Sequence, residues 1–161
     1  RLTPYITVMV GRIDDHIAKA AASGPFVTPG LHAWAGGAVF KKAHQLFVKN
    51  GYTSKLLSAA YRSHLQWTEL VGEGVVLSIP HKWWKRFDSS SIIPQERLSQ
   101  PVPDAILEQL LSIPEFVKVY DEDGLKPDEF ATYGASQFTL NQFLGGLDSL
   151  RQLVRKRMIY A

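Results

Sequence analysis

The amino-terminal half of the sequence alternates three times between a short apolar strand pattern and a helical pattern. Segments rich in β-branched and aliphatic residues predict strands at 5–10, 55–60 and 74–79. The first of these has the near-continuous apolar character of a parallel strand buried on both faces. Parallel strands need helical crossovers, so the alternation predicts an α/β fold built on a parallel sheet.

Helices are expected from apolar spacing and from residues that begin or end helices. Those that follow the three strands are predicted at 14–22, 31–50, 63–71 and 81–87. Gly51 stands where a left-handed cap is expected, and Ser63 with Gln66 forms a capping-box pattern. Each predicted strand is therefore followed by a helix that can cross back over the sheet.

Strand signals cease from residue 88 onward. A polar, proline-bearing loop is predicted at 89–103, with helices at 103–113, 114–120 and 136–158. An alternative fold is a small, self-contained doubly wound sheet. It would need a further strand within 89–130, where the sequence predicts none.

Composition excludes several classes of protein. A chain of 161 residues is about one domain, and 45% hydrophobic with 20% charged residues is typical of a globular protein. No apolar run approaches the ~20 residues of a membrane span, so no membrane partner is predicted. Cysteine is absent, which excludes disulfides, thiolate zinc sites and a cysteine nucleophile and fits a cytoplasmic setting.

The charged residues and histidines exclude two further kinds of partner. A formal net charge of +3, dispersed along the chain, does not predict a nucleic-acid surface and leaves small anionic ligands open. The five histidines show no metal-ligand spacing with acidic residues, so no metal site is predicted.

Two arginines stand at the same place in successive units. Arg12 follows the first predicted strand and Arg62 follows the second. Binding residues of parallel α/β sheets gather at the carboxyl ends of the strands, so both guanidinium groups are expected over one mouth as a clamp for an oxyanion. In the alternative interpretation, each arginine pairs with a nearby acid such as Asp14, Asp15 or Glu69.

The sequences around these arginines resemble the transaldolase family. The segment at 7–13 reads TVMVGRI and looks like the family's sixth-strand motif. The segment at 51–62, GYTSKLLSAAYR, resembles the seventh-strand segment, and LSIP at 77–80 is similar to the end of the eighth strand. The resemblance implies the last three βα units of a (β/α)8 TIM barrel followed by a helical carboxy-terminal extension.

The same resemblance implies a function. Members transfer or cleave a dihydroxyacetone unit of a ketose phosphate through a lysine Schiff base, with no metal and no cofactor. Arg12 and Arg62 match the arginines that bind the sugar phosphate, and Thr7 matches a substrate-facing position that is commonly serine. Ala60 replaces a second serine common near the phosphate, which leaves the identity of the anionic ketose open.

The resemblance also implies that this chain lacks the nucleophile. The family's Schiff-base lysine lies on the fourth strand, so it is expected before Arg1, and the amino-terminal part of the barrel is an expected partner. The start RLTP, with no methionine or signal pattern, likewise suggests a cut. The alternative function is a non-catalytic sugar-phosphate-binding or regulatory protein that kept the anion pocket. Homo-oligomer formation stays open.

Two residues directly after the third strand are further candidates. His81 is a candidate mouth residue, while Lys82 is expected to be a solvated lysine in the first turn of a helix.

Three segments are expected along the chain. They are βα units at 1–88, a loop and short-helix extension at 89–135, and a carboxy-terminal helix at 136–161 that packs on the barrel. Alone, such a piece is expected to be poorly stable or associated, because its sheet edges are open.

Overall fold

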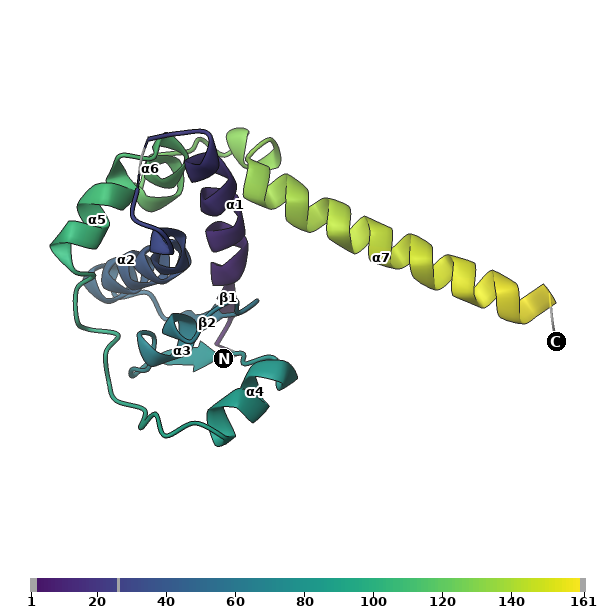
Figure 1. Ribbon diagram of the computed structural model, residues 1–161, viewed down its shortest axis with the longest axis horizontal. Helices are drawn as coiled ribbons and strands as arrows, with labels where there is room; N and C mark the ends of the chain where they lie inside the picture. Colours follow the sequence, from purple (N-terminus) through teal and green to yellow (C-terminus); the bar gives the residue numbers. More distant parts are fainter. Residues whose placement is uncertain (1–2, 26, 160–161) are drawn as a thin grey trace. The chain divides into compact units, whose positions relative to one another are not determined.

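The computed structural model describes residues 3–25 and 27–159 and divides the chain into two compact units, Arg1–Gly124 and Leu125–Ala161 (Figure 1). Arg1, Leu2 and the last two residues, at the outer ends of the expected 1–88 and 136–161 segments, lie outside the described residues. The two units are described separately below.

The first unit is built on a parallel sheet, as the strand–helix alternation predicted. Within the described residues its strands are β1 (Tyr5–Val8), β2 (Lys55–Ser58) and β3 (Val75–Leu77), in the order β1-β2-β3. Both pairs are parallel, and Thr7, Leu57 and Val76 lie in register across the sheet. Residues 89–130 contain no strand, so the self-contained doubly wound alternative is excluded.

The helices of this unit follow the predicted order with several changes of boundary. They are α1 (Val10–Ala22), the 3-10 helix η1 (Leu31–Trp34), α2 (Ala35–Asn50), α3 (Leu65–Thr68), α4 (His81–Asp88), α5 (Asp104–Leu111) and α6 (Pro114–Tyr120). Gly51 caps α2 with φ 64°, as expected. Half of the predicted capping box is present: Oε1 of Gln66 accepts from the backbone N–H of Ser63 at 3.3 Å, whereas Oγ of Ser63 makes no hydrogen bond. His64 directly precedes α3, which is a single turn and ends before the predicted residue 71.

Helix α1 begins earlier than the sequence indicated. Its first turn contains Gly11 and Arg12, whereas the acidic pair Asp14 and Asp15 was expected to mark the start. Val10 is fully buried, and its burial against the neighbouring elements explains why the helix forms directly after β1. Arg12 therefore projects from a helical turn and not from a loop.

Only one face of the sheet is covered by the described residues. Leu56 is buried with Phe40 and Tyr61, and Val75 and Leu77 pack against the same core. Side chains alternate along a strand, so Thr7, Leu57 and Val76 point to the opposite face. Tyr5 and Ile6 are 56% and 47% exposed, so the prediction that the first strand is buried on both faces is not met within this unit.

Helices α5 and α6 add an outer layer over α1 and α2. Leu110 from α5 and Phe116 from α6 are fully buried, and they pack in one core with Ile13, Ile17 and Ala38. Figure 1 shows these two helices on the side of α1 and α2. The polar segment after α4 thus leads to α5 and α6, which cover the outer side of α1 and α2 and complete the hydrophobic core there.

The second unit consists of a 3-10 helix, η2 (Glu129–Ala131), and the long helix α7 (Gly134–Ile159). The latter is slightly longer than the predicted 136–158. Its apolar side chains are largely exposed, among them Phe138, Leu140, Phe143, Leu144, Leu147, Leu150, Leu153 and Val154. Packing of this helix on a barrel stays a prediction.

Candidate anion-binding site

The first turn of α1 lies directly against the loop that follows β2. A β-carbon on Gly11 would overlap the carbonyl oxygen of Ala60 and stand 2.8 Å from Cγ of Arg62. Ala60 itself has φ 64°, the left-handed conformation that costs an alanine roughly 1–2 kcal/mol. The turn that carries Arg12 and the loop that carries Arg62 are therefore neighbours at the carboxyl ends of β1 and β2.

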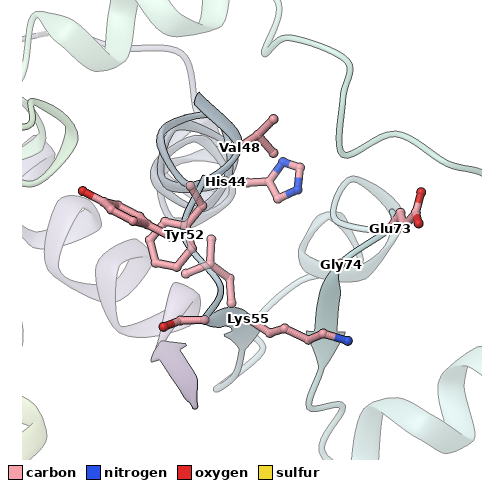
Figure 2. A pocket seen from close by; sticks show the side chains of 9 residues that line it. His44, Val48, Tyr52, Lys55, Glu73 and Gly74 are labelled. Carbon is pink, nitrogen blue, oxygen red and sulfur yellow. The ribbon is translucent and has the colours of Figure 1, made fainter. Parts of the chain in front are cut away.

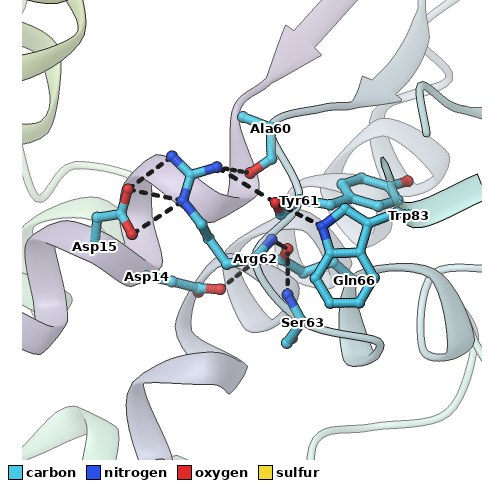
Figure 3. A network of polar contacts seen from close by, with 8 residues as sticks. All are labelled: Asp14, Asp15, Ala60, Tyr61, Arg62, Ser63, Gln66 and Trp83. Carbon is cyan, nitrogen blue, oxygen red and sulfur yellow. Dashed lines mark hydrogen bonds and ion pairs between the residues drawn. The ribbon is translucent and has the colours of Figure 1, made fainter. Parts of the chain in front are cut away.

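The Arg62 guanidinium group is held from two sides (Figure 3). Its Nε donates to both carboxylate oxygens of Asp15, at 3.1 and 3.0 Å, and Nη2 donates to Oδ2 at 2.8 Å. Nη1 donates to the carbonyl oxygens of Ala60 and Tyr61 at 3.0 and 3.3 Å. The pairing with an acid that the sequence left open is thus realised with Asp15, and both side chains are about one-third exposed.

A second acid, Asp14, is buried beside this pair. Its Oδ1 accepts a 2.7 Å hydrogen bond from the backbone N–H of Gly36, and its Oδ2 accepts one from Nε2 of Gln66. Burial is the main cause that raises the Asp14 pKa well above its usual value, and the charge of Asp15 adds to it. The hydrogen bonds from Gly36 and Gln66 and the charge of Arg62 act on this pKa in the opposite direction.

Gln66 connects Asp14 to the backbone of the arginine loop. The Gln66 side chain is fully buried, and its Oε1 accepts hydrogen bonds from the backbone N–H groups of Arg62 and Ser63, the latter at 3.3 Å. One amide side chain therefore bridges α1 and the loop after β2 (Figure 3).

Tyr61 anchors the same loop in the core. Its hydroxyl and Oγ of Ser58 are hydrogen-bonded at 2.7 Å, and both residues are fully buried. Burial raises the pKa of Tyr61 to about 12. Nε1 of Trp83 donates to the Tyr61 carbonyl oxygen at 3.0 Å, which ties α4 to the loop.

The other candidates lie on neighbouring elements. Thr7 is exposed on β1, on the face opposite the helices. Arg12 is half-buried in the first turn of α1. His81 is the exposed first residue of α4, with its ring 5.8 Å from that of Trp84, and Lys82 next to it is also exposed.

Glu69, the third acid considered as an arginine partner, belongs to a separate cluster. It pairs with Lys41 at 3.2 Å and with Arg97 at 3.1 Å. The Lys41 side chain is buried and also donates to the carbonyl oxygens of Arg97 and Gln100, at 2.8 and 2.9 Å. This cluster fastens the segment after α4 to α2, and none of these bonds involves Arg12 or Arg62.

A cavity of about 450 Å³ lies at the amino ends of β2 and β3, away from the arginines (Figure 2). Figure 2 shows Lys55 at its lower side, Tyr52 at the left, and His44 with Val48 from α2 above Lys55. Its lining combines apolar side chains with Lys55, His44 and Glu73. Because neither arginine lines it, this cavity is not part of the candidate anion site.

No helix among the described residues is long and apolar enough to cross a membrane. In the same part of the chain, no three histidine, cysteine or acidic side chains come together in a group that could hold a metal ion.

A family model described as Transaldolase/Fructose-6-phosphate aldolase matches residues 3–132. The chain belongs to this family. Neither the comparison with curated proteins nor that with solved structures gives a significant match. The matched range covers the α/β unit of this transaldolase-family chain from residue 3 onward, including both arginines and the acids around them.

Sequence reasoning missed the roles of Gln66 and Tyr61 at this site. Gln66 was predicted to cap the Ser63 backbone, which is observed, but its bonds to the Arg62 N–H and to Asp14 were not foreseen. Its position four residues after Arg62 was the available signal for the first of these. Tyr61 was given no role of its own, although a buried tyrosine usually needs a hydrogen-bond partner.

Proposed function

We propose that this chain is the carboxy-terminal part of a transaldolase-like enzyme in which Arg12 and Arg62 bind the phosphate of a ketose phosphate. The observation that carries the proposal is the contact of Gly11 with Ala60 and Arg62, because it makes the two arginine-bearing segments neighbours. Planar guanidinium groups bind phosphate oxygens in bidentate fashion, and the amino-terminal turn of α1 adds positive potential. Thr7 and His81 are proposed to face the same mouth.

The sheet supports a barrel that continues beyond these strands. Among the described residues, β1 and β3 each pair on one side only, and one sheet face has no cover. Three strands cannot close a barrel, and parallel sheets normally have both faces covered. An apolar cavity of about 510 Å³ beside β3, lined by Leu77, Ile79 and the 63%-exposed Trp84 among others, offers a surface for the adjoining part of the barrel.

The Schiff-base lysine is proposed to lie in a segment that precedes Arg1. Lys82 is exposed in the first turn of α4, whereas a lysine nucleophile is activated by desolvation or by a neighbouring cation. Borohydride reduction of the full-length enzyme with a ketose phosphate, followed by peptide mapping, tests this assignment. An adduct upstream of Arg1 is expected, and an adduct on Lys82 would contradict it. Phosphate binding with no adduct at all would favour the non-catalytic sugar-phosphate-binding protein.

The phosphate assignment is tested by Arg12→Ala and Arg62→Ala in the full-length enzyme. Each is expected to weaken binding of the sugar phosphate by about 1.5–3 kcal/mol, the range for a charged hydrogen bond. Arg97→Ala is a matched control, because Arg97 is also paired with a carboxylate, that of Glu69, but lies in the other cluster. Parental kcat/KM in both site variants would show that the arginines do not bind the phosphate.

A further inference from the structure

A continuous path of buried hydrogen bonds leads from the start of α2 to the backbone of Arg62. Gly36 N–H donates to Asp14, Asp14 accepts from Gln66, and Gln66 accepts from the N–H groups of Arg62 and Ser63. Asp14 is 2% exposed and Gln66 is fully buried. Neither residue is among the groups proposed to touch the phosphate.

The donors and acceptors on this path fix the orientation of both side chains. Two backbone N–H groups point at Oε1 of Gln66, so Nε2 must face Asp14. Asp14 then meets a donor at each oxygen, the Gly36 N–H at Oδ1 and the Gln66 amide at Oδ2. This pattern fits a carboxylate, because an asparagine would present its own NH2 group to one of the two donors.

The loop that this path holds is also conformationally costly. Ala60 is in the left-handed region, and the carbonyl oxygens of Ala60 and Tyr61 both point at the Arg62 guanidinium group. A strained loop persists only when its surroundings determine its conformation. Gln66 supplies such a constraint at Arg62 itself, since it accepts a hydrogen bond from the backbone N–H of that residue.

We infer that Asp14, acting through Gln66, is a positioning residue that fixes the Arg62 backbone so that its guanidinium group is preorganised for the phosphate. This inference rests on the proposed function. Asp15 holds the guanidinium end of the same side chain, whereas Asp14 and Gln66 hold its backbone end. The arginine is therefore held at both ends before a ligand arrives, which lowers the entropic cost of binding.

Exchanging the carboxylate and the amide between positions 14 and 66 tests the inference. In Asp14→Asn the new NH2 group faces another donor, either the Gln66 amide or the Gly36 N–H. In Gln66→Glu the new carboxylate faces the Asp14 carboxylate, with no proton donor between them. In the double variant, the new amide NH2 at position 14 can donate to the new carboxylate at position 66, while the amide oxygen still accepts from Gly36. The new carboxylate can also accept from the N–H groups of Arg62 and Ser63. The double variant thus keeps every hydrogen bond and the net charge.

The measurements are the dissociation constant for inorganic phosphate and the hydrogen exchange of the Arg62 and Ser63 amides, in the full-length protein. Each single variant is expected to bind phosphate about tenfold more weakly and to exchange both amides faster, because a buried group loses its partner. The double variant is expected to bind within roughly threefold of the parent, since coupled substitutions in contact are non-additive. Lys41→Met is the control, because it breaks a buried cluster elsewhere and should lower stability while phosphate binding persists.

The outcomes separate this inference from the proposed function. If folded single variants bind phosphate as the parent does, the inference is overturned and the arginine assignment stands. If a single variant does not fold, the double variant decides, and a folded double variant with no phosphate binding also overturns the inference. If the parent does not bind phosphate, or Arg62→Ala binds it normally, the proposed function fails and the inference falls with it.

Discussion

Gly11 lies against the carbonyl oxygen of Ala60, so closely that any β-carbon at residue 11 would overlap that oxygen. This contact joins the first turn of α1 to the loop after β2. Because backbone atoms form one side of it, the structure cannot accommodate a side chain at this point by a rotamer change. The contact thus depends on glycine for space, and not for an unusual backbone conformation.

Gly11→Ala is therefore expected to destabilise the protein and to impair the proposed anion site. Separating the turn from the loop should cost about 1–3 kcal/mol or more, as overpacking of a dense core does, and should raise KM for the sugar phosphate. Thermal unfolding and kinetics of the full-length enzyme measure the two effects.

Gly37→Ala is the matched control for this substitution. Gly37 also lies in a helix, α2, but a β-carbon there would meet no atom within 4 Å. Alanine should stabilise that helix by about 0.5–1 kcal/mol, the intrinsic difference from glycine. Equal effects of the two substitutions would contradict the steric explanation.

The sequence predicted the elements of the α/β unit well because their signals are local. Runs rich in β-branched and aliphatic residues located the three strands, and Pro114 marked the start of α6, which ends at Tyr120 as predicted. The position of Arg12 within a helix was missed, because the start of α1 depends on the tertiary burial of Val10 and not on the acids that follow.

The polar contacts of the site could be foreseen only as alternatives. Asp15 was one of three acids considered for Arg62, and the choice among them depends on residues 47 positions apart in the chain. The buried Lys41 gave no signal, because lysine in an amphipathic helix normally lies on the solvated side. Spacing predicts which residues share an edge of the sheet, and packing decides which of them form pairs.

Tyr61 is expected to make the protein sensitive to alkaline pH. Its pKa is raised to about 12, so between pH 10 and 12 the folded state keeps a proton that the unfolded state has lost. Stability should therefore fall by roughly 2–3 kcal/mol as pH rises through this window. Urea unfolding at several pH values measures the fall.

Tyr61→Phe should remove most of this loss of stability at alkaline pH, at a cost near neutral pH. Burial also raises the pKa of Tyr120, which leaves a smaller loss in the variant. The substitution leaves the buried Ser58 hydroxyl without its partner, which costs about 1–3 kcal/mol. Adding Ser58→Ala should recover part of this cost. Tyr52→Phe, at a 57%-exposed tyrosine, is the control, and its stability should still fall between pH 10 and 12 as in the parent. An unchanged pH profile in Tyr61→Phe would assign the effect to another group.

Lys41→Met is expected to release the segment around residues 97–100 from α2. Lys41 is 3% exposed, and its ammonium group serves one carboxylate and two carbonyl oxygens, all of which lose a donor. Breaking a buried pair from one side costs about 3 kcal/mol. Lys49→Met, at an exposed lysine of the same helix, should stay within about 0.5 kcal/mol of the parent. Equal unfolding free energies for the two variants would refute the structural role of Lys41.

Asp15→Asn is expected to tighten the binding of inorganic phosphate. In the present arrangement the Asp15 carboxylate occupies Nε and Nη2 of Arg62 and places a negative charge beside the guanidinium group that is proposed to bind the phosphate. Asparagine retains one oxygen that can accept from the guanidinium group, so the side chain keeps an anchor while the opposing charge is lost. Titration calorimetry of the full-length protein should show an affinity gain of roughly threefold to tenfold, which high salt reduces.

Asp121→Asn provides the control for this last change, because it removes the same charge from an exposed acid in the turn after α6. Its phosphate affinity should match the parent, which would show that the gain in Asp15→Asn is local and not an effect of net charge. A loss of affinity in Asp15→Asn would mean that the carboxylate chiefly orients Arg62 for the phosphate. Asp15 would then position Arg62 together with Asp14 and Gln66. The guanidinium group would bind the phosphate while its ion pair with Asp15 stays in place.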